Sequence, residues 1–345
     1  MSSEEQRSNR FGLLWNKRVE QVSPVVRPSV AIVLVSTDGH AKFLPECLDS
    51  LPGACADLPF RVILVDNDGD SLSCQIARRY KSTVNLECLA QKRPKGFAAN
   101  VNDALKRVTE PYVLLLNVDT VLPEGAVRRT VRVMEEHPKV AALTVRMRGK
   151  DGRLQASARA FPYPSVLLWD QLGLSRFFPK SRIFGKSRLW YVIQTDLTDA
   201  DWASGAYLLL RVEPLRRVGG MDSGFHMYSE DTDLCYRLRK QGWSIVVDPS
   251  VEIFHWKDPL ASTRRRQAFV QTHVSLLRFW DKHGTILRRI AVRLVLLVGI
   301  VGRFLTWPLL LRKGRSFAAQ SLAAYWEVLG TVISRRSADR VRGKQ

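Results

Sequence analysis

Residues 30–35 read VAIVLV, a continuous apolar run that is rich in β-branched side chains and is followed by Ser36-Thr37-Asp38-Gly39. Such a run, bounded by turn-forming residues, is typical of a buried strand in a parallel sheet. Along the chain we expect further strands at 61–65, 84–89, 112–116 and 140–145, separated by helices at 42–51, 76–80, 96–107 and 127–137. This alternation predicts a doubly wound α/β layer, in which ligands bind at the carboxyl ends of the strands.

Polar side chains follow two of these expected strands. Asp66 and Asn67 come directly after the strand at 61–65, and Asn117-Val118-Asp119 follows the strand at 112–116. A single Asp in such a place is usually a loop or cap residue. Two of them at equivalent strand ends favour a ligand site at this edge of the sheet.

The stretch 225–243, FHMYSEDTDLCYRLRKQGW, predicts a helix with an acidic first turn. Ser229 is the expected N-cap, acids near a helix N-terminus are favoured, and the helix should end near Gly242. Asp233 is one turn from Arg237 and can pair with it. Asp231 lies about 200° from Asp233 around the helix and is therefore expected to face a cleft. Acidic capping of a surface helix is the alternative interpretation.

The remaining segments have weaker patterns. Residues 1–28 form an expected loose lead-in, and 151–201 are aromatic, basic and irregular, which suggests a region that covers an active site. A strand is expected at 202–210, where Gly205 lets a ligand approach the backbone. Two short strands are expected at 245–247 and 251–255.

The charge of the chain is unevenly distributed. The net charge is +20, and residues 257–345 contain 18 Lys and Arg against 4 Asp and Glu, which leaves +14 in this part. A basic segment of this kind suits anionic lipid or nucleic acid. The five cysteines form no CxxC pair and no zinc-type spacing, so we expect reduced thiols in a cytoplasmic setting. The polar N-terminal residues predict no signal peptide.

The basic C-terminal part also holds the longest apolar run, at 290–311. It is long enough to span a bilayer. However, each central Arg costs about 2.5–3.5 kcal/mol of insertion free energy and each large apolar residue returns about 0.3–0.6, so the sum is near zero. Arg289, Arg293 and Arg303 project within about 80° of one another, and Pro308 interrupts the run. We therefore expect helices in the membrane interface whose arginines reach anionic headgroups, with a packed helical extension or a single span as alternatives.

Four motifs together resemble the inverting family 2 glycosyltransferases with the GT-A fold, in their bacterial rhamnosyltransferase-like branch. They are Val65-Asp66-Asn67, Gly96-Phe97-Ala98 with Asn102, Asn117-Val118-Asp119 and the segment 219–238. The resemblance covers about 29–282 and implies a nucleotide-binding half at 29–125, an acceptor and catalytic half at 126–282, and a basic amphipathic helical tail at 283–345. The chain departs from the family pattern in the single carboxylate at 117–119, in Pro94 and in Ala104, and these positions bear on the choice of donor sugar.

The resemblance also implies roles for individual residues. Asp231 takes the proton of the acceptor hydroxyl and Glu230 orients the acceptor or assists. Asp119 binds Mg²⁺ or Mn²⁺, a hard cation that neutralises a diphosphate leaving group, and His255 is either a further metal ligand or a structural residue. The arginines at 264–266 either touch the diphosphate or form a solvated face. The implied substrate-binding residues are Asp66, Asn67, Gly96, Phe97, Asn102, Asn117 and Gly205.

The sequence thus predicts a glycosyltransferase at the cytoplasmic face of the plasma membrane. It is expected to move a sugar, rhamnose being one candidate, from a nucleotide-diphosphate sugar to a lipid-linked or polysaccharide acceptor in cell-surface glycan synthesis. A nucleic-acid-binding protein is a rival, but the charge lies beside apolar runs without the spaced aromatic residues of a base-stacking surface, so we expect no nucleic acid partner. A catalytically inactive glycan-binding module is a second rival.

Overall fold

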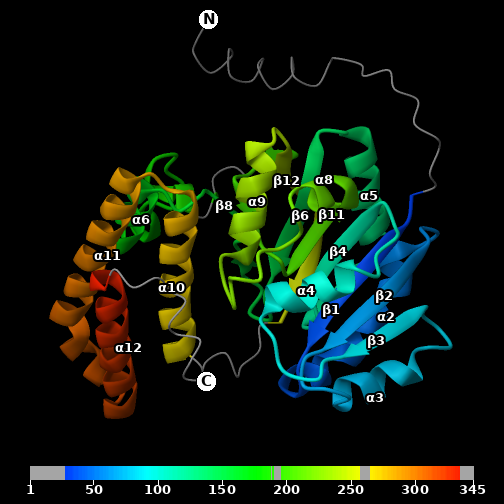
Figure 1. Ribbon diagram of the computed structural model, residues 1–345, viewed down its shortest axis with the longest axis horizontal. Helices are drawn as coiled ribbons and strands as arrows, with labels where there is room; N and C mark the ends of the chain where they lie inside the picture. Colours follow the sequence, from blue (N-terminus) through cyan, green and yellow to red (C-terminus); the bar gives the residue numbers. More distant parts are fainter. Residues whose placement is uncertain (1–27, 188, 190–195, 257–264, 335–345) are drawn as a thin grey trace, which may run out of the picture.

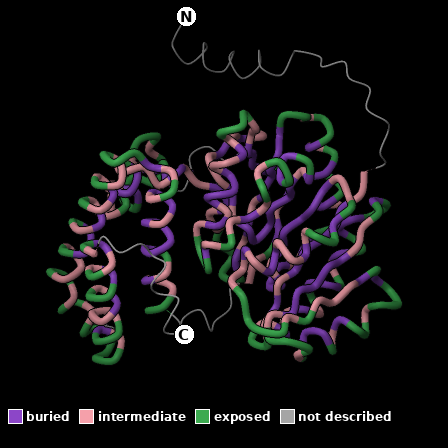
Figure 2. Tube along the Cα trace, in the orientation of Figure 1, coloured by how far each residue is buried: buried purple, intermediate pink, exposed green. Residues whose placement is uncertain are grey.

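The computed structural model describes residues 28–187, 189, 196–256 and 265–334. Figure 1 shows an α/β layer on one side and a group of helices on the other, with α9 facing that group. The expected lead-in at 1–28 lies almost entirely outside the described residues. Figure 2 shows that the buried backbone is concentrated in the strands of the α/β layer.

A single mixed sheet forms the centre of the α/β layer, in the order β3-β2-β1-β4-β11-β6-β12-β5. The first four strands in this order are parallel, as the sequence predicts, whereas β11 is antiparallel to both of its neighbours. The strands are β1 (Val30–Ser36), β2 (Phe60–Asp66), β3 (Leu86–Ala90), β4 (Tyr112–Asn117), β5 (Thr120–Val121), β6 (Val140–Arg148), β11 (Tyr207–Arg211) and β12 (Ser244–His255).

Helices cover both faces of the sheet because side chains alternate between the faces along each strand. In β1, Ile32 and Leu34 pack with one set of helices and Ala31 and Val33 with the other. The first set is α2 (Leu44–Cys55), α3 (Leu72–Arg79) and α5 (Ala126–Glu136). The second set is α4 (Phe97–Leu105), α8 (Val212–Arg217) and α9 (Glu230–Lys240). A short 3-10 helix, η1 (Asp38–Phe43), precedes α2.

Two expected elements differ from the structure. The strand expected at 202–210 is interrupted, because β10 (Trp202–Ala203) leaves the main sheet and pairs with β8 (Ala158–Arg159). The two short strands expected at 245–255 are one strand, β12, with a register shift between Asp248 and Glu252. The irregular stretch contains β7 (Leu154–Gln155), α6 (Pro164–Gln171), α7 (Leu174–Phe177), η2 (Phe184–Ser187) and β9 (Thr198–Asp199).

The C-terminal helices form a packed unit with α6. This helical unit comprises α10 (Arg265–His283), α11 (Ile286–Thr306), η4 (Trp307–Lys313) and α12 (Arg315–Ile333). Its core joins Trp280 of α10, Leu296 of α11 and Val328 of α12, each at most 1% exposed, with Leu167 of α6. Most of this core comes from α10, α11 and α12, so α10 packs with the helices that follow it.

The arginines of α11 point into the helical unit, so the expectation that they reach lipid headgroups was wrong. Arg293 donates to Asp281 at 3.2 Å and to the Val332 carbonyl at 2.9 Å, and Arg303 donates to the Gly299 carbonyl and to Gln171. The outward face is apolar instead. Its residues, each at least half exposed, are Ile286, Leu287, Ile290, Leu294, Val298, Val301 and Leu305, which we call the apolar stripe. Among the described helices, Ile286–Arg312 is long and apolar enough to cross a membrane by length and composition.

One pair of cysteines is not reduced. Cys74 of α3 and Cys88 of β3 form a disulfide, with their Cα atoms 6.0 Å apart. The expectation of reduced thiols is therefore wrong for this pair, whose 14-residue separation carries no sequence signal of its own. Cys47, Cys55 and Cys235 are buried free thiols.

Candidate active site

The acidic helix α9 begins after a strained turn. Tyr228 and Ser229 have φ values of 67° and 64°, a left-handed conformation that costs free energy for residues other than glycine. Ser229 is the N-cap, as the sequence predicts, but its side chain makes no capping hydrogen bond. Leu234 and Leu238 are fully buried and Gly242 follows the helix with φ 86°, both as expected. The strain lies directly before the two carboxylates that face a cavity.

Asp231 lines this cavity, which has a volume of about 430 Å³ and which we call the catalytic cavity. Its Oδ1 accepts a hydrogen bond from the Thr232 amide at 2.7 Å, and its Oδ2 accepts one from the Gly205 amide at 3.3 Å. Burial raises the pKa of Asp231, and these two amides partly offset the effect. The predicted cleft-facing position of Asp231 is therefore correct, and Gly205 serves it as a backbone donor.

Glu230 lines the same cavity but has a different environment. Its side chain is 8% exposed, and its Oε2 has no hydrogen-bond partner within the described part of the chain. Burial, and then the charge of Asp231, raises the pKa of Glu230 to about 8. The two amides favour the charged form of Asp231, whereas Oε2 of Glu230 has no such donor among the described residues, so Glu230 is the member of the pair that holds a proton more readily. Such a pair offers one proton acceptor and one hydrogen-bond donor to a hydroxyl-bearing ligand.

Asp233 faces away from the cavity and has a structural role. It pairs with Arg237 at 2.7 Å, as the sequence predicts, and also with Lys282 and His283 of α10, each at 2.7 Å. Burial alone would raise the pKa of Asp233, but these partners outweigh it and hold the pKa at about 2. The buried Asp233 carboxylate thus links α9 to α10 of the helical unit.

Asn117, Asp119 and His255 form a second cluster at the ends of β4 and β12. His255 Nε2 lies 3.4 Å from Asp119 Oδ1 and 3.4 Å from Asn117 Nδ2. Asp119 is 8% exposed. Burial would raise the pKa of Asp119, but the hydrogen bond and charge of His255 outweigh it and leave the pKa below its ordinary value. The structure thus brings the expected metal ligands together.

Gln155 orients His255, and the sequence reasoning missed it. The Gln155 carbonyl oxygen lies 2.9 Å from His255 Nδ1, and the Gln155 amide donates to the His255 carbonyl at 2.9 Å. Because a carbonyl oxygen only accepts, Nδ1 carries a proton, and Nε2 is the ring nitrogen that faces Asp119. Gln155 lies on the short strand β7 within the irregular stretch, where no periodicity marks it.

These residues fit a divalent cation that is shared with a ligand. No three His, Cys, Asp or Glu side chains converge on one point in the described ranges, and Asp119 and His255 are the two that face each other here. Mg²⁺ and similar ions commonly take one or two protein ligands and complete their coordination with phosphate oxygens and water. Nε2 of His255 and the Asp119 carboxylate would be the donor set for such an ion, with His255 neutral when the ion is bound.

The residues expected to bind the nucleotide lie at the ends of β2 and α4. Asp66 is fully buried and accepts hydrogen bonds from the amides of Asp68, Ser71 and Cys74 and from the Ser71 hydroxyl. These four donors occupy its acceptor sites, so Asp66 shapes the loop after β2. Asn67 binds the backbone of Lys95 through both of its side-chain groups. Their contact with a nucleoside remains a prediction.

Gly96 and Phe97 meet the turn before α9. A Cβ on Gly96 would lie 2.6 Å from the His226 carbonyl oxygen, so a side chain there does not fit. The Phe97 amide donates to the same carbonyl at 3.1 Å, and its ring lies against Gly205. Asn102 lies apart, because its side chain is bound to the backbone of Met221 at 2.7 and 3.0 Å and lines a different groove. The structure therefore gives Asn102 a loop-holding position.

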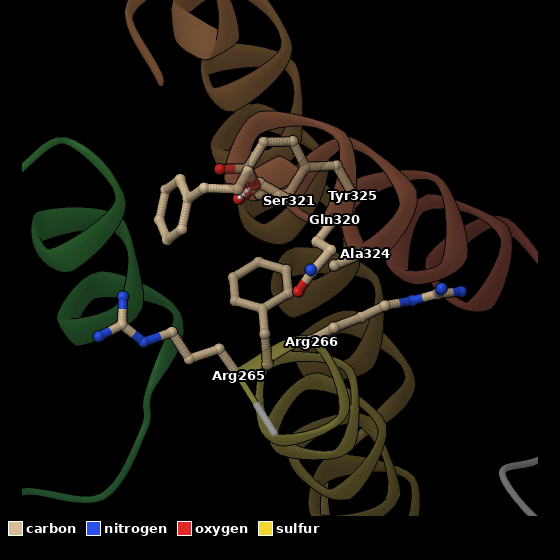
Figure 3. Close-up of a pocket in the computed structure, with 8 residues that line it drawn as sticks. Arg265, Arg266, Gln320, Ser321, Ala324 and Tyr325 are labelled. Carbon is tan, nitrogen blue, oxygen red and sulfur yellow. Dashed lines mark hydrogen bonds between the residues drawn. The ribbon is translucent and has the colours of Figure 1, made fainter. Parts of the chain in front are cut away.

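The arginines at 265 and 266 belong to the helical unit. Figure 3 shows a cavity between α10 and α12, of about 310 Å³, from which the Arg265 and Arg266 side chains extend in opposite directions. Arg266 pairs with Glu327 at 3.1 Å, and Arg265 lies 5.8 Å from the Phe317 ring centre. Their expected contact with a diphosphate at the sheet edge is not supported by this position. Position 264 lies outside the described residues.

Comparison with known proteins identifies relatives of the chain. Residues 30–193 match the family described as glycosyl transferase family 2. Rhamnosyltransferase WbbL of Escherichia coli (strain K12) is 27% identical over 237 residues, covering 66% of this chain and 83% of the relative. The N-acetylglucosaminyl-diphospho-decaprenol L-rhamnosyltransferase of Mycobacterium tuberculosis is 29% identical over 248 residues, covering 67% of this chain and 76% of the relative.

A solved structure shares the fold. The mannosyltransferase PcManGT from Pyrobaculum calidifontis, solved in complex with GDP-Man and Mn²⁺, superposes with a TM-score of 0.54 over 98% of this chain and 93% of its own. Its sequence identity of 17% is low, so the similarity concerns the fold. The sheet described above is accordingly the GT-A fold, as expected from the sequence.

Proposed function

We propose that the chain is a family 2 glycosyltransferase that transfers a sugar with inversion, using a divalent cation. The match of residues 30–193 to that family and the shared fold support this. The relatives of the chain support a nucleotide-sugar glycosyltransferase of cell-surface glycan synthesis that acts on a lipid-linked or polysaccharide acceptor. The two rhamnosyltransferases make L-rhamnose the sugar to test first.

The observation that carries the proposal is the pair Asp231 and Glu230 in the catalytic cavity. Two backbone amides fix the Asp231 carboxylate and favour its charged form. In the proposed step, Asp231 accepts the proton of the acceptor hydroxyl while the hydroxyl oxygen forms a bond to the anomeric carbon of the donor. The bond from that carbon to the nucleotide diphosphate breaks on the opposite face, so one displacement inverts the configuration. Neutral Glu230 donates a hydrogen bond that orients the acceptor.

Asp119 and His255 are the residues that would hold the divalent cation, with Gln155 fixing the His255 ring. When bound, the cation supplies positive charge that stabilises the departing diphosphate. Asn117 lies 3.4 Å from His255 and closes this edge of the site. Gly96 and Phe97 place the loop of His226 beside the catalytic cavity.

The acceptor is proposed to be lipid-linked and the protein to work at the cytoplasmic face of the plasma membrane. The mycobacterial relative is named for a diphospho-decaprenol substrate. The apolar stripe of α11 supplies a surface that suits the acyl region of a membrane, and the basic C-terminal part suits anionic lipid. The arrangement supports a peripheral protein in the membrane interface, with α11 as the segment concerned.

A donor screen tests the proposed function. UDP-, GDP- and dTDP-sugars, with dTDP-L-rhamnose among them, are incubated with a prenyl-diphosphate-linked N-acetylglucosamine and Mg²⁺, Mn²⁺ or EDTA. We expect transfer from one donor only, no transfer with EDTA, and a product whose anomeric configuration by NMR is opposite to that of the donor. A product with retained configuration would contradict direct displacement, and full activity with EDTA would contradict the use of a metal.

A further inference from the structure

The residues that line the catalytic cavity are of three chemical kinds. Glu230 and Asp231 are carboxylic acids, and Arg159 is a cation. The third kind is apolar and comes from the helical unit: Val166 and Leu167 of α6 and Leu276 of α10, each at most 9% exposed, which we call the apolar wall. Arg159 is the cation among the described residues that line the cavity. A ligand that fills the cavity would have to carry a hydroxyl group, an anionic group and an apolar group.

Arg159 is held in place by the ribbon of β8 and β10. It lies opposite Trp202 in the register of the two strands, and its guanidinium carbon is 5.8 Å from the centre of the Trp202 ring. The ring is itself fixed, because Trp202 Nε1 donates to the Ala160 carbonyl at 3.0 Å. A further bond from the Ser204 amide to the Ser157 carbonyl at 2.8 Å closes the ribbon. A guanidinium over an indole ring keeps its N–H groups directed outward in the plane of the guanidinium.

The charge of Arg159 acts within the site. Burial dominates in raising the pKa of Asp231, and Arg159 is among the groups that lower it, which places the guanidinium within electrostatic reach of the carboxylate. A guanidinium forms two parallel hydrogen bonds to phosphate, a geometry that a lysine does not reproduce. A ligand whose hydroxyl meets Asp231 can therefore present a phosphate to Arg159 and an apolar chain to the apolar wall of the same cavity.

We propose that Arg159 binds the phosphate that joins the acceptor sugar to its lipid, and that it selects phosphate-linked acceptors over neutral glycans. This inference rests on the proposed function, because it concerns the acceptor of that reaction. It assigns the apolar wall of Val166, Leu167 and Leu276 to the first part of the lipid chain. Trp202 is then a positioning residue that fixes the Arg159 guanidinium.

Binding without turnover tests the inference directly. A short-chain prenyl diphosphate and the matching prenol are titrated into the full chain in EDTA, so that no cation draws the diphosphate to Asp119 and His255. We expect Arg159→Gln to weaken binding of the diphosphate by about 10- to 100-fold, the value of a charged hydrogen bond, and to leave prenol binding unchanged. The affinity of Arg159→Lys for the diphosphate should lie between those of the wild type and Arg159→Gln. Arg153→Gln replaces an exposed arginine on the neighbouring loop and should bind the diphosphate as the wild type does. Unchanged diphosphate binding by Arg159→Gln, or an equal loss for diphosphate and prenol, would overturn the inference.

A transfer assay separates this inference from the proposed function. The acceptors are N-acetylglucosamine linked by diphosphate to a short prenyl chain and the octyl glycoside of the same sugar. We expect Arg159→Gln to raise KM for the first acceptor and to leave the second unchanged. An equal fall of kcat with both acceptors would show that Arg159 acts through Asp231 and would overturn the inference. If the wild type glycosylates neither acceptor while its diphosphate binding depends on Arg159, the proposed function fails and the binding role of Arg159 stands.

Discussion

Two adjacent carboxylates at the start of α9 have different hydrogen-bond surroundings. Asp231 accepts two backbone hydrogen bonds, whereas Glu230 is buried with one oxygen unpartnered in the described structure. Amide donors favour the ionised form, and burial without donors favours the neutral form. An amide mimics a protonated carboxyl group. We therefore expect Asp231→Asn to lose transfer activity and Glu230→Gln to keep most of it.

Glu230→Gln should keep most of the transfer activity at pH 7, because Glu230 is already neutral there. The wild type should lose activity as the pH rises through about 8, where Glu230 ionises beside Asp231, and the Gln variant should lack this alkaline limb. The raised pKa also means that the stability contributed by neutral Glu230 is full below about pH 4.5 and is lost as the pH rises to about 8. Rate–pH profiles and urea unfolding of both proteins between pH 5 and about 9 check this. An inactive Gln variant at pH 7 would show that Glu230 acts as an ionised group.

Gln155→Ala should weaken metal binding, because the His255 ring loses the acceptor that fixes its tautomer. Partners of this kind typically contribute 10- to 100-fold in metal affinity, so about that loss is expected. Calorimetry of Mn²⁺ binding in the presence of nucleoside diphosphate measures it. Arg153→Ala, two residues away and 87% exposed, is the matched control. Affinity equal to the wild type in Gln155→Ala would place the cation elsewhere.

At the scale of elements, the contact between α9 and α10 joins the two parts of the molecule. Asp233 is fully buried, and it binds Arg237 of its own helix and both Lys282 and His283 at the end of α10. Lys282 also pairs with Asp222 at 2.7 Å, which ties α10 to the turn before α9. This contact positions α10, whose Leu276 forms part of the cavity wall.

Asp233→Asn should lower the free energy of unfolding by about 3 kcal/mol at pH 7, since removing one member of a buried ion pair leaves the other charges uncompensated. Because the pKa of Asp233 is about 2, its contribution is full above about pH 3.8 and is lost as the pH falls toward 2. The Asn variant should therefore show a weaker acid dependence. Asp281→Asn, which breaks a pair with Arg293 that is 35% exposed on the Asp281 side, should cost about 1 kcal/mol or less. If the two substitutions lowered the free energy of unfolding equally in denaturant titrations, the stabilising role of the contact between Asp233 and α10 would be contradicted.

The sequence predicted the strands and helices of the first 150 residues well because each has a simple local pattern. Buried parallel strands read as continuous apolar runs, and the helices between them have apolar residues at regular spacing. The interruption at Ser204 was missed because Trp202–Leu210 remains apolar although its first residues pair with β8. That pairing is a long-range contact with a stretch that has no period of its own. Gln155 and Arg159 were missed for the same reason.

At the scale of the whole molecule, the apolar stripe is an exposed apolar surface on the helical unit. Seven apolar side chains of α11 are at least half exposed, while the arginines on the other side of the helix bind within the helical unit. The sequence predicted a helical extension whose arginines reach lipid headgroups, whereas Arg293 and Arg303 bind within the helical unit and apolar side chains face outward. Helical spacing gives the angle between Arg and Leu side chains, whereas the packing of α6, α10 and α12 decides which of them point outward.

The triple substitution of Leu287, Leu294 and Leu305 by Ser should reduce flotation with anionic liposomes while leaving the fold and nucleotide binding intact. These side chains are 81%, 57% and 78% exposed, so their loss removes membrane contacts and few internal ones. The matched control replaces Leu72 and Leu154, two exposed leucines of the α/β layer, by Ser. Flotation unchanged by the triple substitution would show that the stripe is not the membrane-facing surface.

The proposed role of Asp231 as the base is tested most directly by the transfer rate of Asp231→Asn, measured beside Glu230→Gln with the same donor, acceptor and metal. A general base contributes about 10²- to 10⁴-fold, so the Asn variant should lose at least about 100-fold in kcat while it still binds the nucleotide sugar. Glu230→Gln should stay within about tenfold of the wild type at pH 7. An Asp231→Asn variant that turns over within about tenfold of the wild type would contradict the account, because the acceptor proton would then leave by another route.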